Sequence, residues 1–170
     1  MVKIQGYLVV LVEPDYKSKL NNSYEGIDRL PPYPSLFEQE QEAMELYVFG
    51  DYKNEYNVIT SLDKAMDLKQ QFSESPRKFE ILFSRNHTFG QPLSSNHVFI
   101  GYDVAGIGDF WSIVGDYPPH PQIKKYLTSF NRFGLFKEPS VAIEFLHEYK
   151  NLKLADYDIN FHVFEMFKVV

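Results

Sequence analysis

Three strand-like segments in the middle of the chain, 79–85, 97–104 and 110–114, constrain the fold most, because no helical pattern separates them. Apolar and polar residues alternate in the first two, as they do in a β-strand whose side chains point to opposite faces in turn. Parallel neighbours need a long crossover, usually a helix, so consecutive strands favour antiparallel pairing. We therefore predict an α+β fold with a mostly antiparallel sheet.

Two longer alternating segments, 2–12 and 159–169, predict further strands near the two ends of the sequence, and 47–49 and 56–59 are shorter candidates. Segment 97–104 is expected to alternate without interruption. Its two expected faces are Val98, Ile100, Tyr102 and Val104 on one side, and His97, Phe99, Gly101 and Asp103 on the other.

Apolar residues at helical spacing predict three helices, at 62–72, 121–130 and 141–149. Capping supports each one: Thr60 or Ser61 precedes the first, Pro121 occupies the first turn of the second, and Ser140 precedes the third. A fourth, acidic helix is expected at 35–46, where a serine and a glutamate stand at capping-box spacing. The sheet is therefore expected to carry about three to four packed helices.

Length and composition narrow the class of protein. The 170 residues suit a single domain, 1–170, and no linker or repeat divides them. The excess of 23 acidic over 17 basic residues disfavours nucleic-acid binding, and the absence of cysteine excludes disulfides and thiolate metal sites. The longest early apolar run, Tyr7–Val12, is too short for a signal peptide core or a membrane span. We expect a soluble cytoplasmic protein with no membrane contact.

Motifs that carry known chemistry are missing from the sequence. It has no phosphate-binding loop, no Gly-x-Ser-x-Gly elbow and no His-Glu-x-x-His pair, and its five histidines show no helical i, i+4 pairing. We therefore expect no catalytic residue, no metal site and no cofactor. One alternative stays open, a small hydrolase-like enzyme that uses His97, Asp103 or His120 in a cleft.

Negative charge is concentrated in the first half of the chain. Residues 1–75 contain 13 acidic and 7 basic residues, whereas residues 76–170 contain 10 of each. The acidic run is interleaved with tyrosine, and aromatic anchors beside orienting charges are typical of protein interfaces. A solvated helix face is the alternative interpretation. The predicted partner-binding residues are Tyr33, Glu38, Glu40, Glu42, Asp51 and Tyr52, with Asp109 and Trp111 as a second patch.

A short stretch of the chain, Gly101–Ala105 and then Asp109–Ile113, resembles a segment of the small bacterial immunity proteins that accompany polymorphic or contact-delivered toxins. By composition alone this stretch reads as a hairpin, a strand followed by a Gly-rich turn and a returning strand. The resemblance implies a cytoplasmic protein that binds one toxin domain tightly and blocks its active site or a nearby surface. It assigns no site residues to this chain.

Together these features predict a non-enzymatic inhibitor that neutralises a cognate toxin domain, a basic protein such as a nuclease, through an acidic, Tyr-rich surface. A peptide-binding regulatory or scaffold domain is a further alternative. It would use the long polar segment 13–34 or the Pro-rich turns at 31–34 and 118–121. The sequence leaves the oligomeric state open.

Overall fold

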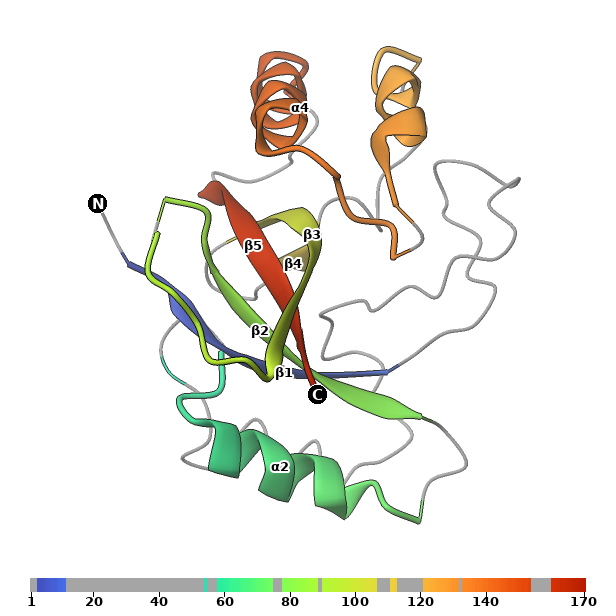
Figure 1. Cartoon of the computed structure of the whole chain (residues 1–170). Helices are drawn as coiled ribbons and strands as arrows, with labels where there is room; N and C mark the ends of the chain where they lie inside the picture. The colour runs from blue at the N-terminus through green and yellow to red at the C-terminus, as the bar shows by residue number, and fades with distance from the viewer. Residues whose placement is uncertain are drawn as a thin grey trace.

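A computed structural model describes residues 3–11, 54, 58–74, 78–88, 90–106, 111–112, 121–131, 133–153 and 160–170. These residues contain five strands, two α-helices and one 3-10 helix (Figure 1). In chain order the elements are β1 (Gln5–Leu11), α2 (Leu62–Gln71), β2 (Phe79–Asn86), β3 (His97–Gly106), β4 (Trp111–Ser112), η2 (Lys124–Ser129), α4 (Pro139–Asn151) and β5 (Phe161–Val169).

The strands form one sheet in the order β1-β2-β5-β3-β4, and every neighbouring pair is antiparallel. This confirms the α+β class and the antiparallel sheet. The described residues contain two α-helices, fewer than the three to four predicted. The expected acidic helix at 35–46 and the candidate strand at 47–49 lie outside the described residues.

The predicted helix at 121–130 is wrong in type, because its described core is the 3-10 helix η2. The amide of Tyr126 donates to the carbonyl of Ile123, an i to i+3 bond of 3.0 Å. Such bonds give three residues per turn. Phe130 then leaves the helix to pair with Phe136 in an isolated antiparallel bridge. The i, i+3 apolar spacing therefore fits the tighter helix.

Capping of the two α-helices matches the sequence in one case only. The hydroxyl of Ser61 accepts from the amide of Lys64 at 3.3 Å, so the predicted cap of α2 is confirmed. The predicted cap of α4 at Ser140 is wrong, because the helix begins two residues earlier than predicted, at Pro139, and its N-cap residue is Glu138. Proline at the first helical position has a suitable φ and lacks an amide that would need a partner there.

A β-bulge interrupts strand β3. Phe99 is opposite Phe167 on β5, but Gly101 is already opposite Met166, so Ile100 is an extra residue. An extra residue in one strand reverses the alternation beyond it. The expected uninterrupted alternation of 97–104 is therefore wrong. Residues before Ile100 and residues after it that were expected to share a face of the sheet lie on opposite faces.

The strand register places the residues that α2 and α4 cover on one face of the sheet. Figure 1 shows the two helices at opposite ends of the sheet. Helix α2 packs on β1 and β2, where its residues share a buried cluster with Val9 and Ile81. Helix α4 and η2 pack on β3 and β5, where Tyr126, Phe145 and Tyr149 join Val104 and Val163. The other face holds a third buried cluster: Ile4, Leu8, Val10, Val58, Leu82, Ile100, Ala105, Leu135, Phe164 and Met166.

Strands β2 and β3 run parallel to each other, because both are antiparallel to β5 between them. The connection 87–96 must therefore return along the length of the sheet, and its described residues, 87–88 and 90–96, form no helix. Its ends are tied to β5: the amide of His87 donates to Val163, and Asn96 accepts from Val170, at 3.1 and 2.9 Å. None of the described helices is long and apolar enough to cross a lipid bilayer.

Candidate functional site

Most of the predicted partner-binding residues fall on parts of the chain that the structure does not describe. They are Tyr33, Glu38, Glu40, Glu42, Asp51, Tyr52 and Asp109. Trp111 is placed by its backbone in β4, where it pairs with Gly106 of β3. The expected hairpin between these two strands is thus confirmed. Because β4 ends the strand order among the described residues, the backbone of Trp111 lies in an edge strand of the described sheet.

Arg85 is the most buried charged side chain on the helix-covered face, with 9% of its surface exposed. Its Nε atom donates to Oε2 of Glu165 on β5 at 2.6 Å, and its Nη1 atom donates to the carbonyl oxygen of Gln91. The guanidinium carbon lies 5.1 Å from the ring centre of Phe167, a cation–π distance. The side chain thus joins two strands to the connection 87–96.

Aromatic rings surround this ion pair along the same face. Phe167 contacts Phe83 on one side and Phe99 on the other, with ring centres 6.3 and 5.5 Å apart. Phe99 in turn contacts Tyr102, at 5.1 Å. Burial raises the pKa of Tyr102, and the nearby carboxylate of Glu165 raises it further. The phenol therefore stays protonated, as a hydrogen-bonding rather than a charged group.

The hydrolase interpretation placed His97 and Asp103 on one face of a strand, and the bulge in β3 corrects this. His97 is opposite Val169 and Asp103 is opposite Phe164, five positions apart on β5, so the two side chains point to opposite faces. Ring nitrogen Nδ1 of His97 lies 2.8 Å from Oγ of Ser94. His120, the third candidate, lies outside the described residues.

Asp103 itself has no exposed surface, and its Oδ1 atom accepts from the amide of Val104 at 2.8 Å. A carboxylate in this position is accessible to substrate only if the fold opens. Its geometry therefore suits a structural role in the core better than general acid–base work, which needs contact with a reacting group.

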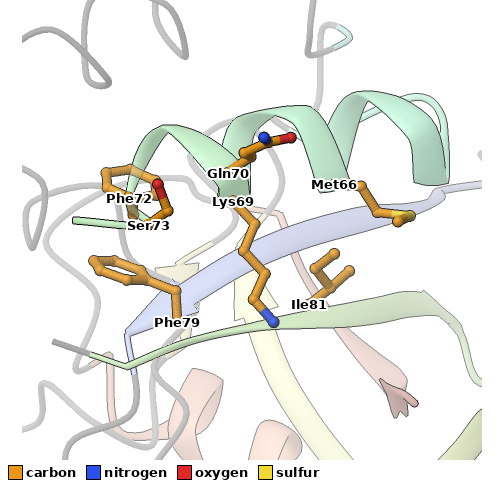
Figure 2. Close-up of a pocket in the computed structure, with 7 residues that line it drawn as sticks. All are labelled: Met66, Lys69, Gln70, Phe72, Ser73, Phe79 and Ile81. Carbon is orange, nitrogen blue, oxygen red and sulfur yellow. The ribbon is translucent and has the colours of Figure 1, made fainter. Parts of the chain in front are cut away.

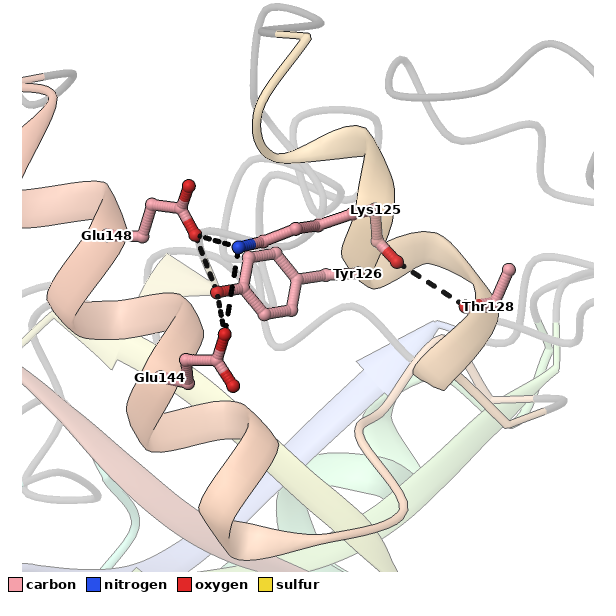
Figure 3. A network of polar contacts seen from close by, with 5 residues as sticks. All are labelled: Lys125, Tyr126, Thr128, Glu144 and Glu148. Atoms are coloured by element: carbon pink, nitrogen blue, oxygen red, sulfur yellow. Dashed lines mark hydrogen bonds and ion pairs between the residues drawn. The ribbon is translucent and has the colours of Figure 1, made fainter.

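Sequence reasoning missed a polar cluster between η2 and α4 (Figure 3). The hydroxyl of Tyr126 lies 2.7 Å from Oε2 of Glu148 and 3.0 Å from Oε1 of Glu144. The amino group of Lys125 lies 2.7 and 3.6 Å from the same two oxygens, and 4.8 Å from the centre of the tyrosine ring. The i, i+4 spacing of the two glutamates was the available signal, but the same spacing is equally typical of a solvated helix face.

A second cluster missed by the sequence surrounds Glu80 on β2. The amino groups of Lys78 and Lys168 lie 3.0 and 3.3 Å from its Oε1, and that of Lys69 lies 3.9 Å from its Oε2. Burial alone would raise the pKa of Glu80, but Lys78 and Lys168 outweigh it and hold the pKa below its usual value. The carboxylate is thus held in the charged form.

A groove beside this cluster lies between α2 and the first residues of β2 (Figure 2). Its volume is about 440 Å³, within the range of ligand-sized cavities. Phe72 and Phe79 stack within it, with ring centres 4.2 Å apart and planes 14° from parallel. The lining residues are Met66, Lys69, Gln70, Phe72, Ser73, Phe79 and Ile81.

No group of three or more histidine, aspartate or glutamate side chains is arranged to hold a metal ion within the described ranges. No family model, no curated protein and no solved structure matches this chain.

Proposed function

We propose that this protein is a non-enzymatic inhibitor that binds and neutralises a cognate bacterial toxin domain, in the manner of an immunity protein. The acidic, Tyr-rich surface around Glu38, Glu40 and Glu42 would contact a basic partner such as a nuclease domain. Charge complementarity of this kind accelerates association and orients the two proteins.

The observation that carries the proposal is how the two halves of the chain use their charge. In the second half, Glu80, Glu144, Glu148 and Glu165 all contact lysine, arginine or tyrosine side chains of the same chain. These carboxylates hold strands and helices together, and the charges of this half sum to zero. The net charge of −6 therefore comes from residues 1–75, which supports a partner-binding role there.

Within the part of the chain that the structure describes, β4 is an edge strand, which supports the second patch. Trp111 pairs with Gly106 at the last strand of the sheet, and Asp109 precedes it by two residues. Tryptophan is among the residue types that contribute most to binding energy at protein interfaces. An edge strand is also where a partner can approach without displacing another strand.

Affinity capture of the tagged full-length chain from a lysate of its source organism tests the proposal. We expect one stoichiometric partner, basic in composition and toxic when it is expressed alone. Its association rate should fall steeply with added salt, because exposed charges are screened. Empty eluates at low and moderate salt would overturn the inhibitor function.

Charge reversal then tests the surface. Changing Glu38, Glu40 and Glu42 to lysine should slow association with the captured partner and flatten its salt dependence. The matched control changes Asp67, Glu74 and Glu138, three exposed carboxylates outside the run 38–42 of the sequence, to lysine and alters the net charge equally. Equal slowing by both triple variants would assign the effect to net charge and reject the acidic surface as the contact site.

A further inference from the structure

The outer edge of β3, the side of the strand that faces away from β5, is only partly occupied by other described segments. Its far end pairs with β4. Tyr102 exchanges two backbone hydrogen bonds with Phe136, of 2.9 and 2.8 Å, and the side-chain amide of Asn131 donates to the carbonyl of Ile100 at 2.6 Å. The second half of this edge therefore already accepts antiparallel neighbours, and the first residues of β3, 97–99, lie beyond these contacts.

Hydrogen bonds at the start of β3 show which backbone groups point outward. The amide of Val170 donates to the carbonyl of Asn96 at 2.9 Å, so residue 96 faces β5. Backbone groups alternate between the two sides of a strand, so those of Val98 also face β5, whereas those of His97 and Phe99 face outward. The amide of His97 bonds within the preceding turn. Among the described residues, none bonds to the carbonyl of His97 or to either backbone group of Phe99.

Apolar side chains are exposed on both faces of the same three residues. Val98 is 47% exposed on one face of the sheet, and Phe99 is 45% exposed on the other. Phe167, the neighbour of Phe99 on β5, is buried. An edge strand with outward backbone groups and exposed apolar side chains is a template for pairing with another chain, and native proteins usually protect such an edge with charge or proline.

We propose that the section 97–99 of β3 binds an extended segment of a partner protein, which adds to the sheet as an antiparallel strand. One residue of the segment would exchange two backbone hydrogen bonds with Phe99, and the residue two positions further along would donate to the carbonyl of His97. Two consecutive partner side chains would then lie beside Val98 and Phe99, on opposite faces. The occupant is therefore a segment with two consecutive β-branched or aromatic residues.

The size of the open section and its nearest charge favour this occupant over others. Three residues of a strand extend only about 10 Å, whereas a stable dimer buries about 800 Å² per partner, so a second copy of the chain gains too little here. Lys168, opposite Val98, is paired with Glu80. Backbone groups and apolar side chains, rather than charge, thus define the ligand. The proposal uses none of the acidic residues of the proposed function, so either can fail experimentally without the other.

Amide hydrogen exchange in the full-length chain, measured by nuclear magnetic resonance, tests whether the section is open. The amide of Phe99 should exchange faster than that of Val98, which faces β5. Fluorescence anisotropy then measures binding of a fluorescein-labelled peptide that has valine and phenylalanine at its two central positions, between threonines. We expect saturable binding that slows exchange at Phe99.

Two N-methylated peptides test the backbone pairing. Successive amides of an extended peptide point to opposite sides, so only one of the two central amides can face β3. Methylation of one central amide should therefore weaken binding at least about tenfold, and methylation of the other should leave it unchanged. Equal binding of all three peptides would show that only side chains make the contact and would reject strand addition.

Two variants locate the site on the protein. Val98→Glu places a carboxylate beside Lys168 and should weaken peptide binding by about tenfold, because a charge on an edge strand opposes pairing. Phe99→Thr keeps a residue that favours strands and should lose binding to a similar extent. The matched control Met66→Glu changes an apolar side chain that is 55% exposed on α2, and it should leave binding unchanged. Circular dichroism confirms that each variant is folded.

Three further results would overturn the proposal. If the amide of Phe99 is as protected as that of Val98 in the free chain, the edge is already covered. Absent or non-saturable peptide binding would remove the extended ligand. A concentration-dependent dimer that Val98→Glu abolishes would assign the edge to a second copy of the chain.

Discussion

The Nε atom of Arg85 on β2 lies 2.6 Å from Oε2 of Glu165 on β5, and both side chains are largely buried on the helix-covered face. The same guanidinium donates to the carbonyl oxygen of Gln91 in the connection that returns from β2 to β3. Arg85 therefore stabilises two features at once: the central strand pair, and a long parallel connection whose described residues contain no helix.

Removing one partner of this pair should be costly. Glu165→Gln leaves a buried guanidinium without its counter-ion, so we expect a loss of about 3–5 kcal/mol in the free energy of unfolding, measured by urea denaturation. The double variant Arg85→Met with Glu165→Leu removes both charges. Its loss of unfolding free energy should be clearly smaller than the sum of the losses of the two single variants Arg85→Met and Glu165→Leu. Additive losses would show that the two side chains act independently.

Two glycines with positive φ provide a matched pair of substitutions. At Gly101, φ is +142° and a Cβ atom would lie 2.7 Å from Cβ of Leu135 and 2.9 Å from Nδ2 of Asn131. Gly101→Ala should therefore cost roughly 3 kcal/mol or more. At Gly90, φ is +59° and a Cβ atom would meet nothing within 4 Å, so Gly90→Ala should cost only about 1 kcal/mol. Equal losses in thermal unfolding would argue against close packing at the bulge.

Glu80 predicts a specific acid sensitivity. Its folded-state pKa is lowered, because Lys78 and Lys168 outweigh the effect of burial. The resulting stabilisation is complete above the usual value of 4.5 and is lost as the pH falls through the lower folded-state pKa. Glu80→Gln should therefore flatten the fall of unfolding free energy below pH 4.5. An acid limb identical to that of the parent protein would contradict this assignment.

Tyr126 predicts the corresponding effect at alkaline pH. Burial, together with the hydrogen bonds to Glu148 and Glu144, raises the pKa of its phenol well above 10. The stabilisation is complete below the unfolded-state value of about 10 and is lost as the pH rises above it, because only the unfolded chain can then ionise this group.

Tyr126→Phe should therefore lower the free energy of unfolding at neutral pH by about 1–3 kcal/mol and flatten its decline above pH 10. Ultraviolet titration of the folded protein at pH 11 should count the same number of ionised tyrosines with and without this substitution, because Tyr126 stays protonated in the folded state. Loss of one tyrosinate signal at pH 11 in the variant would show that Tyr126 ionises normally.

Local sequence patterns were sufficient for the elements whose environment is simple. Alternation placed the strand at 79–85 within one residue of β2, and helical spacing with a serine cap placed α2. The Gly-rich turn after 101–105 predicted the pairing of β3 with β4. Periodicity within an element shows which of its faces is buried whatever the partner is, and the β3–β4 hairpin is itself local, so a short-range pattern carries the information in each case.

The amino-acid sequence by itself determined the fold class, the antiparallel sheet and the uneven distribution of charge, because these follow from periodicity and composition. Only the tertiary structure decided that β5, the last strand, lies between β2 and β3, and that Ile100 is an extra residue opposite β5. Both depend on contacts between residues far apart in the chain. That long-range pairing separates His97 from Asp103 across the sheet and brings Lys69, Lys78 and Lys168 to one carboxylate.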